Sequence, residues 1–270
     1  MQRTNKMPLR AAGLFIILVL IAITLVCGLF LLLDTPLPGW FVVVGRWLPA
    51  LVALAVLRLV PLPGGPLRWM SLRPGGWRRL VGGGLAAVAA LTAVYALSAA
   101  AAVLLGPAEP QPAAALLRFA VLLLPSVLLF SLSTLGEEAA WRGLLQQTLA
   151  DLGFWRSSAL ISGVWVLFHV PLHGTMALQG ALPWDMMAVT TAALFPLGLF
   201  LSAVTVRFGS VWPAVFAHAL PLSALNLVSN AGDLGAGALW GLTAVTAALL
   251  TAAAYLFARV PAGGARRAGA

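Results

Sequence analysis

The sequence predicts an all-α, polytopic integral membrane protein, a bundle of about eight transmembrane helices. Hydrophobic residues make up 61% of its 270 residues, and charged residues only 9%. A soluble domain carries about 25% charged residues and about 45–50% apolar ones, so this chain could not cover a water-facing surface. Its apolar runs also reach the length of roughly 20 residues that a helix needs to cross a bilayer. The mean hydropathy of +1.01 agrees with this fold class.

Apolar runs separated by short loops rich in proline and glycine account for most of the chain. The first run follows a basic flank, as in a signal peptide, but it is too long for one and lacks a clear cleavage site. We therefore expect it to be an uncleaved first helix. The eight candidate spans fall at about 11–33, 40–60, 80–105, 113–136, 157–173, 186–206, 210–229 and 235–258.

The basic residues orient the predicted bundle. If the N-terminus is cytoplasmic, fourteen of the sixteen Lys and Arg residues fall on the cytoplasmic side, and only Arg46 and Arg118 fall elsewhere. Basic loops resist translocation, so we predict a multi-pass cell-membrane protein with both termini in the cytoplasm. The net charge of +9 does not indicate nucleic-acid binding, because no basic run is interleaved with aromatic residues that could stack on bases. The fourteen are Arg3, Lys6, Arg10, Arg58, Arg68, Arg73, Arg78, Arg79, Arg142, Arg156, Arg207, Arg259, Arg266 and Arg267.

Two adjacent glutamates end the fourth predicted span, in Gly-Glu-Glu-Ala-Ala-Trp-Arg. An ionisable group in a membrane helix is costly, so it is a candidate functional residue by default. If the helix continues to about Leu149, Glu138 and Arg142 are four residues apart and lie on one face, where they can pair. Glu137 then points about 100° away around the helix and is left available to face the interior. The alternative is a solvated helix end with a surface salt bridge.

The histidines of two later spans lie at a depth similar to that of Glu137. His169 is 12 residues from Ser157, about 18 Å at 1.5 Å per residue, and His218 is 8 residues from Ser210, about 12 Å. Either could be a hydrogen-bonded core residue if it stood alone. Three proton-transferring side chains at matching depth on three helices indicate a catalytic site. His173, near the outer end of the fifth span, is left out of it.

Together these residues resemble the CPBP intramembrane proteases, which include the CAAX prenyl endopeptidases and the bacteriocin-processing or immunity proteins of the abortive-infection family. The first motif, Glu-Glu-x-x-x-Arg, spans 137–142. The second, aromatic-x-x-x-His, spans 165–169 with Trp where Phe is usual, and Gly-Ser-Val-Trp-Pro at 209–213 leads to the third motif at His218. The resemblance covers about 115–230. It implies a catalytic core at 113–230 between N-terminal helices at 1–112 and a last helix with a basic cytoplasmic tail at 231–270.

The resemblance also implies roles for these side chains. Glu137 and His169 would activate a water molecule for attack on a peptide carbonyl, and Arg142 would hold Glu138 in place. His218 would stabilise the oxyanion. The family commonly has a polar residue four positions after this histidine, where this chain has Leu222, so Asn226 is the nearest substitute. On a straight helix Asn226 lies about 12 Å from His218 along the axis, too far to share an oxyanion, and only a kink at Pro221 could bring it back.

Several alternatives remain open at this point. Glu137, His169 and His218 could instead hold Zn²⁺ with a water in the fourth position, and the sequence does not decide between metal and metal-free catalysis. A catalytically weak immunity or scaffold relative on the same fold and a proton-coupled transporter are the alternative functions. The expected partners are the lipid bilayer and a membrane-embedded or lipidated peptide. A CAAX-like C-terminus, a bacteriocin leader and a membrane-protein segment all stay open as substrates, as does the oligomeric state.

Overall fold

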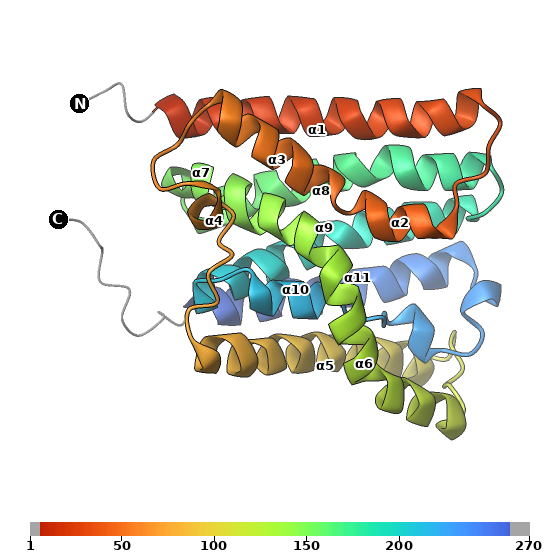
Figure 1. The fold of residues 1–270 in the computed structure, drawn as a ribbon. Coiled ribbons are helices and arrows are strands. Elements are labelled where there is room, and N and C mark those ends of the chain that lie inside the picture. The colour runs from red at the N-terminus through yellow and green to blue at the C-terminus, as the bar shows by residue number, and fades with distance from the viewer. Residues whose placement is uncertain (1–5, 260–270) are drawn as a thin grey trace.

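The fold is a bundle of helices, in agreement with the predicted class. The computed structural model describes residues 6–259, and within that range it contains no β-strand, only an isolated bridge between Pro110 and Val228 (Figure 1). The long helices are α1 (Lys6–Leu32), α3 (Leu48–Leu59), α5 (Gly83–Leu104), α6 (Ala113–Glu138), α8 (Phe154–Leu178), α9 (Trp184–Phe208) and α11 (Ala236–Arg259).

Short helical segments join or extend the long helices. The α-helical ones are α2 (Gly39–Gly45), α4 (Pro66–Trp69), α7 (Gln146–Thr148) and α10 (Trp212–His218). Two segments are π-helical, η1 (Arg78–Gly82) and η2 (Ala139–Leu145), and three are 3₁₀ turns, η3 (Ala150–Leu152), η4 (Leu225–Leu227) and η5 (Ala231–Asp233). Because η2 and α7 continue α6 without a break, the fourth predicted span carries its helix past Arg142, as the pairing of Glu138 with Arg142 requires.

Within residues 6–259, seven helical segments are long and apolar enough to cross a membrane, one fewer than we predicted. The prediction for 210–229 is wrong, because α10 has only seven residues and ends at His218. Pro221 lacks an N–H and disfavours helical geometry in the residue before it. After α10 the chain continues as irregular segments and short 3₁₀ turns.

The irregular segment after α10 nevertheless takes the chain to the opposite end of the bundle, where α11 begins (Figure 1). Part of its backbone bonds to the loop before α6: Ser229 N–H donates to the Glu109 carbonyl, and Gln111 Nε2 donates to the carbonyls of Asn226 and Val228. Non-helical backbone is tolerated at membrane depth where protein covers it and bonds to it.

The start of α1 and the end of α11 lie at the same end of the bundle (Figure 1). This end also carries α4 and α7. Three basic residues counted in the sequence analysis, Arg3, Arg266 and Arg267, fall outside the described residues, as does most of the predicted basic tail.

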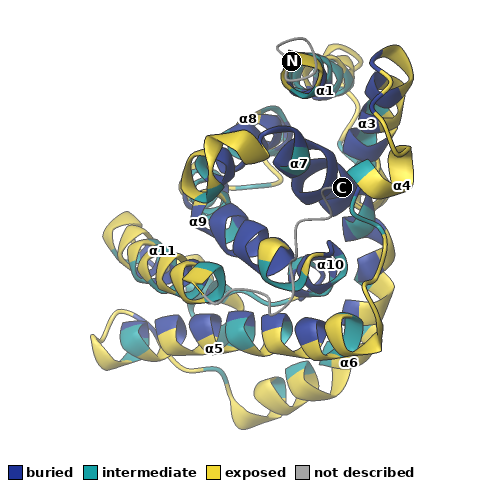
Figure 2. Ribbon diagram, turned by 90° about the vertical axis from the view of Figure 1, so that its left-hand side faces the viewer, coloured by how far each residue is buried: buried dark blue, intermediate teal, exposed yellow. Residues whose placement is uncertain are grey.

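The buried centre of the bundle is built from the segment η2–α7 with α8, α9 and α10, and the other helices surround it (Figure 2). All seven residues of η2 are buried. The outer faces of α1 and α6 expose leucines such as Leu25, Leu117 and Leu132, which suits contact with lipid chains. Ionisable side chains from η2, α8 and α10 are therefore held at the middle of the protein, away from the lipid-facing surface.

Candidate active site

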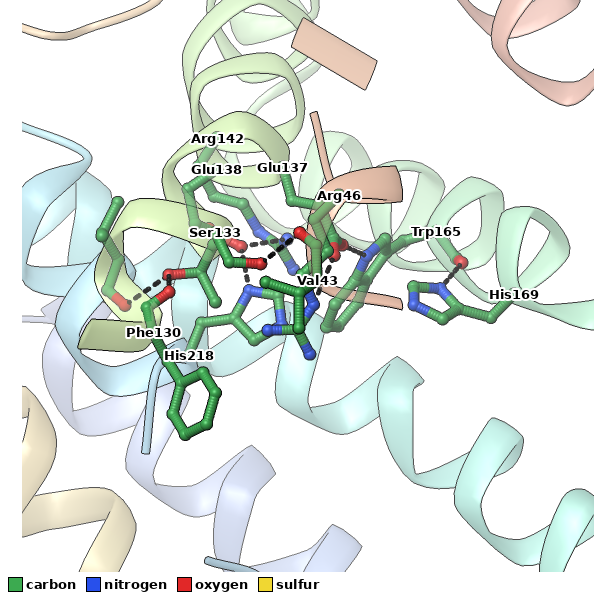
Figure 3. Close-up of polar contacts among 12 residues, drawn as sticks. Val43, Arg46, Phe130, Ser133, Glu137, Glu138, Arg142, Trp165, His169 and His218 are labelled. Atoms are coloured by element: carbon green, nitrogen blue, oxygen red, sulfur yellow. Dashed lines mark hydrogen bonds and ion pairs between the residues drawn. The ribbon is translucent and has the colours of Figure 1, made fainter. Parts of the chain in front are cut away.

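Glu138 is the centre of a largely buried polar cluster. Arg142 Nη1 donates to Glu138 Oε1 at 3.0 Å, which is the pairing that the four-residue spacing predicted. His218 Nδ1 lies 2.8 Å from the same oxygen, so α10 joins the cluster through this histidine (Figure 3). The side chains of Glu138 and Arg142 are both 0% exposed. The guanidinium of Arg142 also lies 4.4 Å from the centre of the Trp165 ring, a cation–π contact.

Glu137 faces a different set of partners. Its Oε2 accepts a hydrogen bond from Trp165 Nε1 at 2.7 Å, and its Oε1 lies 3.4 Å from Arg46 Nε (Figure 3). We predicted that Glu137 would be free to face the interior of the bundle, and the structure places it there in contact with both residues. Its carboxylate is 1% exposed. The roughly 100° that separates adjacent helical residues sends Glu137 and Glu138 to different neighbours.

Arg46 and Trp165 were not identified from the sequence as partners of Glu137. Arg46 was noticed only as a basic residue off the basic side of the bundle, and an arginine inside an apolar run is itself a signal of function. Trp165 was recognised as the aromatic position of the second motif. Phenylalanine, which is usual there, has no N–H group, so the indole N–H of Trp165 could have indicated a hydrogen bond at this position.

Close packing of α6 against the break between α2 and α3 brings Arg46 to Glu137. A Cβ atom at Gly136 would lie 2.6 Å from the Arg46 carbonyl oxygen and 2.7 Å from Trp47 Cα, so only glycine permits this approach. One turn earlier on α6, Ser133 Oγ donates to the Val43 carbonyl at 2.7 Å. Packing therefore explains the glycine before the two glutamates, because its lack of a side chain lets Arg46 approach them.

His169 is oriented by its own helix. Its Nδ1 lies 2.9 Å from the Trp165 carbonyl oxygen, and a carbonyl only accepts, so Nδ1 carries the proton. In the neutral ring Nε2 is then an acceptor. His169 and Glu137 line one small cavity of about 70 Å³ together with Arg46. Because a bound water needs a cavity of only about 10–15 Å³ by this measure, the space beside Glu137 suits water.

His173, which the sequence analysis left out, lines the same cavity. Its ring centre lies 5.3 Å from that of His169, and its Nδ1 is 2.8 Å from Thr191 Oγ1 on α9. The four-residue spacing on α8 places both histidines on one face, and the helix continues through Pro171. His173 therefore forms part of the wall of this cavity.

A second cavity of about 230 Å³ lies beside the first. Arg46 and Val42 line both, so they stand at the boundary between the two. His218 and the irregular segment after it form one wall of the second cavity, and Phe130 forms another. His169 and His218 thus border adjoining cavities, and Arg46 lies at the boundary between the two cavities.

Asn226 does not join the cluster of Glu137, Glu138 and the histidines. Its Oδ1 accepts hydrogen bonds from the Ser223 backbone N–H at 2.9 Å and from Ser223 Oγ at 2.8 Å, and these are the contacts of its side chain. The helix that would have carried it ends at His218, so neither a straight nor a kinked helix connects the two residues. Leu222 is partly buried against apolar core residues.

The three side chains proposed as zinc ligands do not form a recognised metal-binding group. Among residues 6–259 no group of three or more His, Cys, Asp or Glu side chains is placed to hold a metal ion. His169 Nδ1 and His218 Nδ1 are bonded to a carbonyl and to Glu138, so Nε2 is the ring nitrogen that each could offer to a ligand. Both oxygens of Glu137 have protein partners.

Residues 116–221 match the family model described as type II CAAX prenyl endopeptidase Rce1-like. This segment contains all three motifs and confirms the resemblance predicted from them. At family level the match supports a CAAX-type membrane protease, and with the apolar helices it indicates a multi-pass membrane protein. No curated protein and no solved structure matches the chain.

Proposed function

We propose that this protein is an intramembrane endopeptidase that hydrolyses a peptide bond of a membrane-embedded or lipidated substrate. The observation that carries the proposal is the small cavity, large enough for water, that Glu137 and His169 share, with His218 in the adjoining cavity. Hydrolysis needs a water molecule beside a group that can accept its proton, and both are provided for here in an otherwise apolar bundle.

Activation of the water uses the two groups that line the smaller cavity. His169 presents Nε2, because its Nδ1 proton is held by the Trp165 carbonyl. Glu137 is oriented by the Trp165 N–H and by Arg46. As the water oxygen attacks the peptide carbonyl carbon, its proton passes to this Glu137–His169 pair, which later returns it to the leaving amine. These steps use protein groups alone.

Glu138 and Arg142 act by positioning His218. Both imidazole nitrogens carry a proton only in the imidazolium form, and an imidazolium here holds its Nδ1 proton against the Glu138 carboxylate. In that form Nε2–H is free to donate to the oxyanion from the side of the larger cavity. Arg142 keeps the Glu138 carboxylate in place for this purpose.

Proteolysis by the purified protein tests this function. Candidate substrates are a prenylated CAAX-type peptide, a leader peptide and a peptide from a membrane-spanning segment, each with wild-type protein and with Glu137→Gln. We expect cleavage of at least one by the wild type and none by Glu137→Gln, because the amide cannot accept the proton at a similar side-chain volume. Equal cleavage by both proteins would exclude Glu137 as the base.

Two further outcomes of this experiment are informative. Failure of the wild type on every substrate class would favour the non-catalytic immunity or scaffold relative, which the loss of a polar residue at Leu222 makes a specific alternative. Cleavage that a chelator abolishes and added Zn²⁺ restores would contradict the metal-free mechanism.

We further propose that both termini face the cytoplasm, on the basis of the basic residues and the common end of α1 and α11. Reporter fusions to the C-terminus and within 68–79 should both report the cytoplasm. An external signal from either one would reverse this orientation.

A further inference from the structure

The two permanent N–H donors of the cluster do not reach its cavities: Trp165 donates to Glu137, and Arg142 is fully buried and lines neither cavity. Asn226 bonds to Ser223, and position 222 is a leucine. In a neutral His218 the single ring proton lies at Nδ1 beside Glu138, which leaves Nε2 without one. Any stabilisation by His218 therefore depends on its protonation. A permanent N–H donor must come from elsewhere in the bundle.

We propose that Arg46, from the break between α2 and α3, is a catalytic residue that donates hydrogen bonds to the oxyanion of the tetrahedral intermediate. The inference rests on the proposed protease function and adds a residue that lies outside the three motifs and outside the matched segment 116–221. Arginine stays protonated at any working pH and offers five N–H donors. One of these, at Nε, faces Glu137.

The other donors of Arg46 belong to a side chain that lines both cavities. Among the described residues, its two terminal amino groups have no hydrogen-bond partner, and its side chain is 29% exposed. Arg46 lines the cavity of Glu137 and His169 and also the cavity of His218. A substrate peptide carbonyl that lies between His169 and His218 therefore meets the activated water on the side of the smaller cavity. At the boundary between the two cavities it meets the guanidinium of Arg46.

The surrounding packing holds the Arg46 backbone in place before substrate arrives. Gly136 lets the Arg46 carbonyl approach α6, and the hydrogen bond from Ser133 to Val43 ties α2 to the same helix. Donors that are already positioned need no reorganisation when charge develops, which is the condition under which they accelerate a reaction most.

Proximity to the base favours an oxyanion over a more distant anion. The terminal amino groups of Arg46 are only two covalent bonds from the Nε that faces Glu137, so a ligand bound to them lies beside the reacting water. The terminal carboxylate of a substrate cleaved several residues from its end, or a lipid phosphate at the membrane surface, would lie farther from Glu137.

Hydrolysis of the peptide bond needs no reactant other than the water molecule. The water oxygen forms a bond to the carbonyl carbon, its proton moves to the Glu137–His169 pair, and the π electrons of the carbonyl move to its oxygen. That oxyanion accepts N–H bonds from Arg46 and from protonated His218. Collapse restores the carbonyl and breaks the bond to nitrogen, which takes the proton as the amine leaves.

Kinetics of Arg46→Gln test the inference, with Arg118→Gln as the matched control because Arg118 is an exposed arginine on α6 outside the site. We expect kcat/KM of Arg46→Gln to fall by about 10²–10³, mainly through kcat, as for loss of one oxyanion donor. A peptide phosphonamidate, whose tetrahedral anion mimics the intermediate, should bind Arg46→Gln more weakly by a similar factor. Arg118→Gln should behave as wild type in both assays.

The Glu137→Gln background separates a direct role from positioning of the base. We expect Arg46→Gln to weaken phosphonamidate binding there too, since the guanidinium contacts the anion itself. If the effect disappears in that background, Arg46 acts only through Glu137 and the inference is wrong. Should Arg46→Gln fail to fold, Arg46→Ala with added guanidinium ion provides the second test, and absence of rescue in folded protein would also overturn it. An inactive wild type would instead reject the protease function.

Discussion

Two consecutive residues of one helix, Glu137 and Glu138, occupy opposite kinds of site. The region around Glu138 is closed, with Arg142 from the same helix and His218 bonded to one carboxylate oxygen, and with both members of the ion pair 0% exposed. The region around Glu137 borders a cavity, and its ion-pair partner Arg46 is 29% exposed. The closed region is suited to positioning a side chain, and the open region is suited to exchanging a proton with water.

The two glutamates also differ in how far along the chain their ion-pair partners lie. Arg142 is four residues from Glu138 and would reach it in almost any fold that keeps the helix intact. Arg46 is far from Glu137 in the chain and reaches it only because α6 packs against the break between α2 and α3. Adjacent identical residues thus acquire different partners, because different helices face them.

The largest expected effect is that of Glu138→Gln. It removes the ion-pair partner of the fully buried guanidinium of Arg142, so stability should fall by about 3–5 kcal/mol, and cleavage should be lost as well. Glu137→Gln is the matched variant one residue away, and it should cost clearly less, because Arg46 retains solvent contact and no buried charge is left unpaired. Thermal unfolding of the purified proteins measures both. Equal destabilisation would show that the two regions do not differ as described.

His218→Ala should be the next most damaging. Loss of one oxyanion donor lowers the rate by about 10²–10³, and the alanine also removes the contact from α10 to Glu138. Steady-state cleavage kinetics give this factor, with folding checked by thermal unfolding. Full activity in a folded His218→Ala protein would make His218 a packed core histidine and favour the non-catalytic relative.

Trp165→Phe tests the region around Glu137 and should lower activity less than His218→Ala does. The ring packing remains, but the hydrogen bond to Glu137 Oε2 is lost. A hydrogen bond to a charged group contributes about 1.5–3 kcal/mol, so kcat/KM should fall by about 10–100-fold if this bond orients the base. Trp155→Phe, at an exposed position of the same helix, is the control. Unchanged kinetics in Trp165→Phe would mean that Arg46 alone orients Glu137.

The smallest effect is expected for Asn226→Ala. Its side chain bonds to Ser223 and not to any residue of the site, so cleavage should fall by well under tenfold. The same kinetic assay decides this point. Damage as large as that of His218→Ala would mean that the segment after α10 rearranges around substrate to bring Asn226 into the site.

Much of the fold and part of the candidate site followed from local sequence patterns. Apolar runs of sufficient length predict most of the spans because a bilayer demands about 20 apolar residues whatever the tertiary arrangement. The helical rise predicted similar depths for His169 and His218, and the structure places them beside Glu137 and Glu138 respectively. The span at 210–229 was predicted wrongly, because its composition is apolar enough for a membrane helix, while Pro221 ends that helix near its middle.

The sequence by itself determined the membrane bundle and the pairing of Glu138 with Arg142, and it identified the candidate site residues, because each depends on composition or on spacing along the chain. Only the tertiary structure decided the partners of Glu137, the place of His173 and the separation of Asn226 from His218. Those outcomes depend on which helices pack together and how closely. At Gly136 the absence of a side chain, which no periodicity reveals, admits Arg46 to the site.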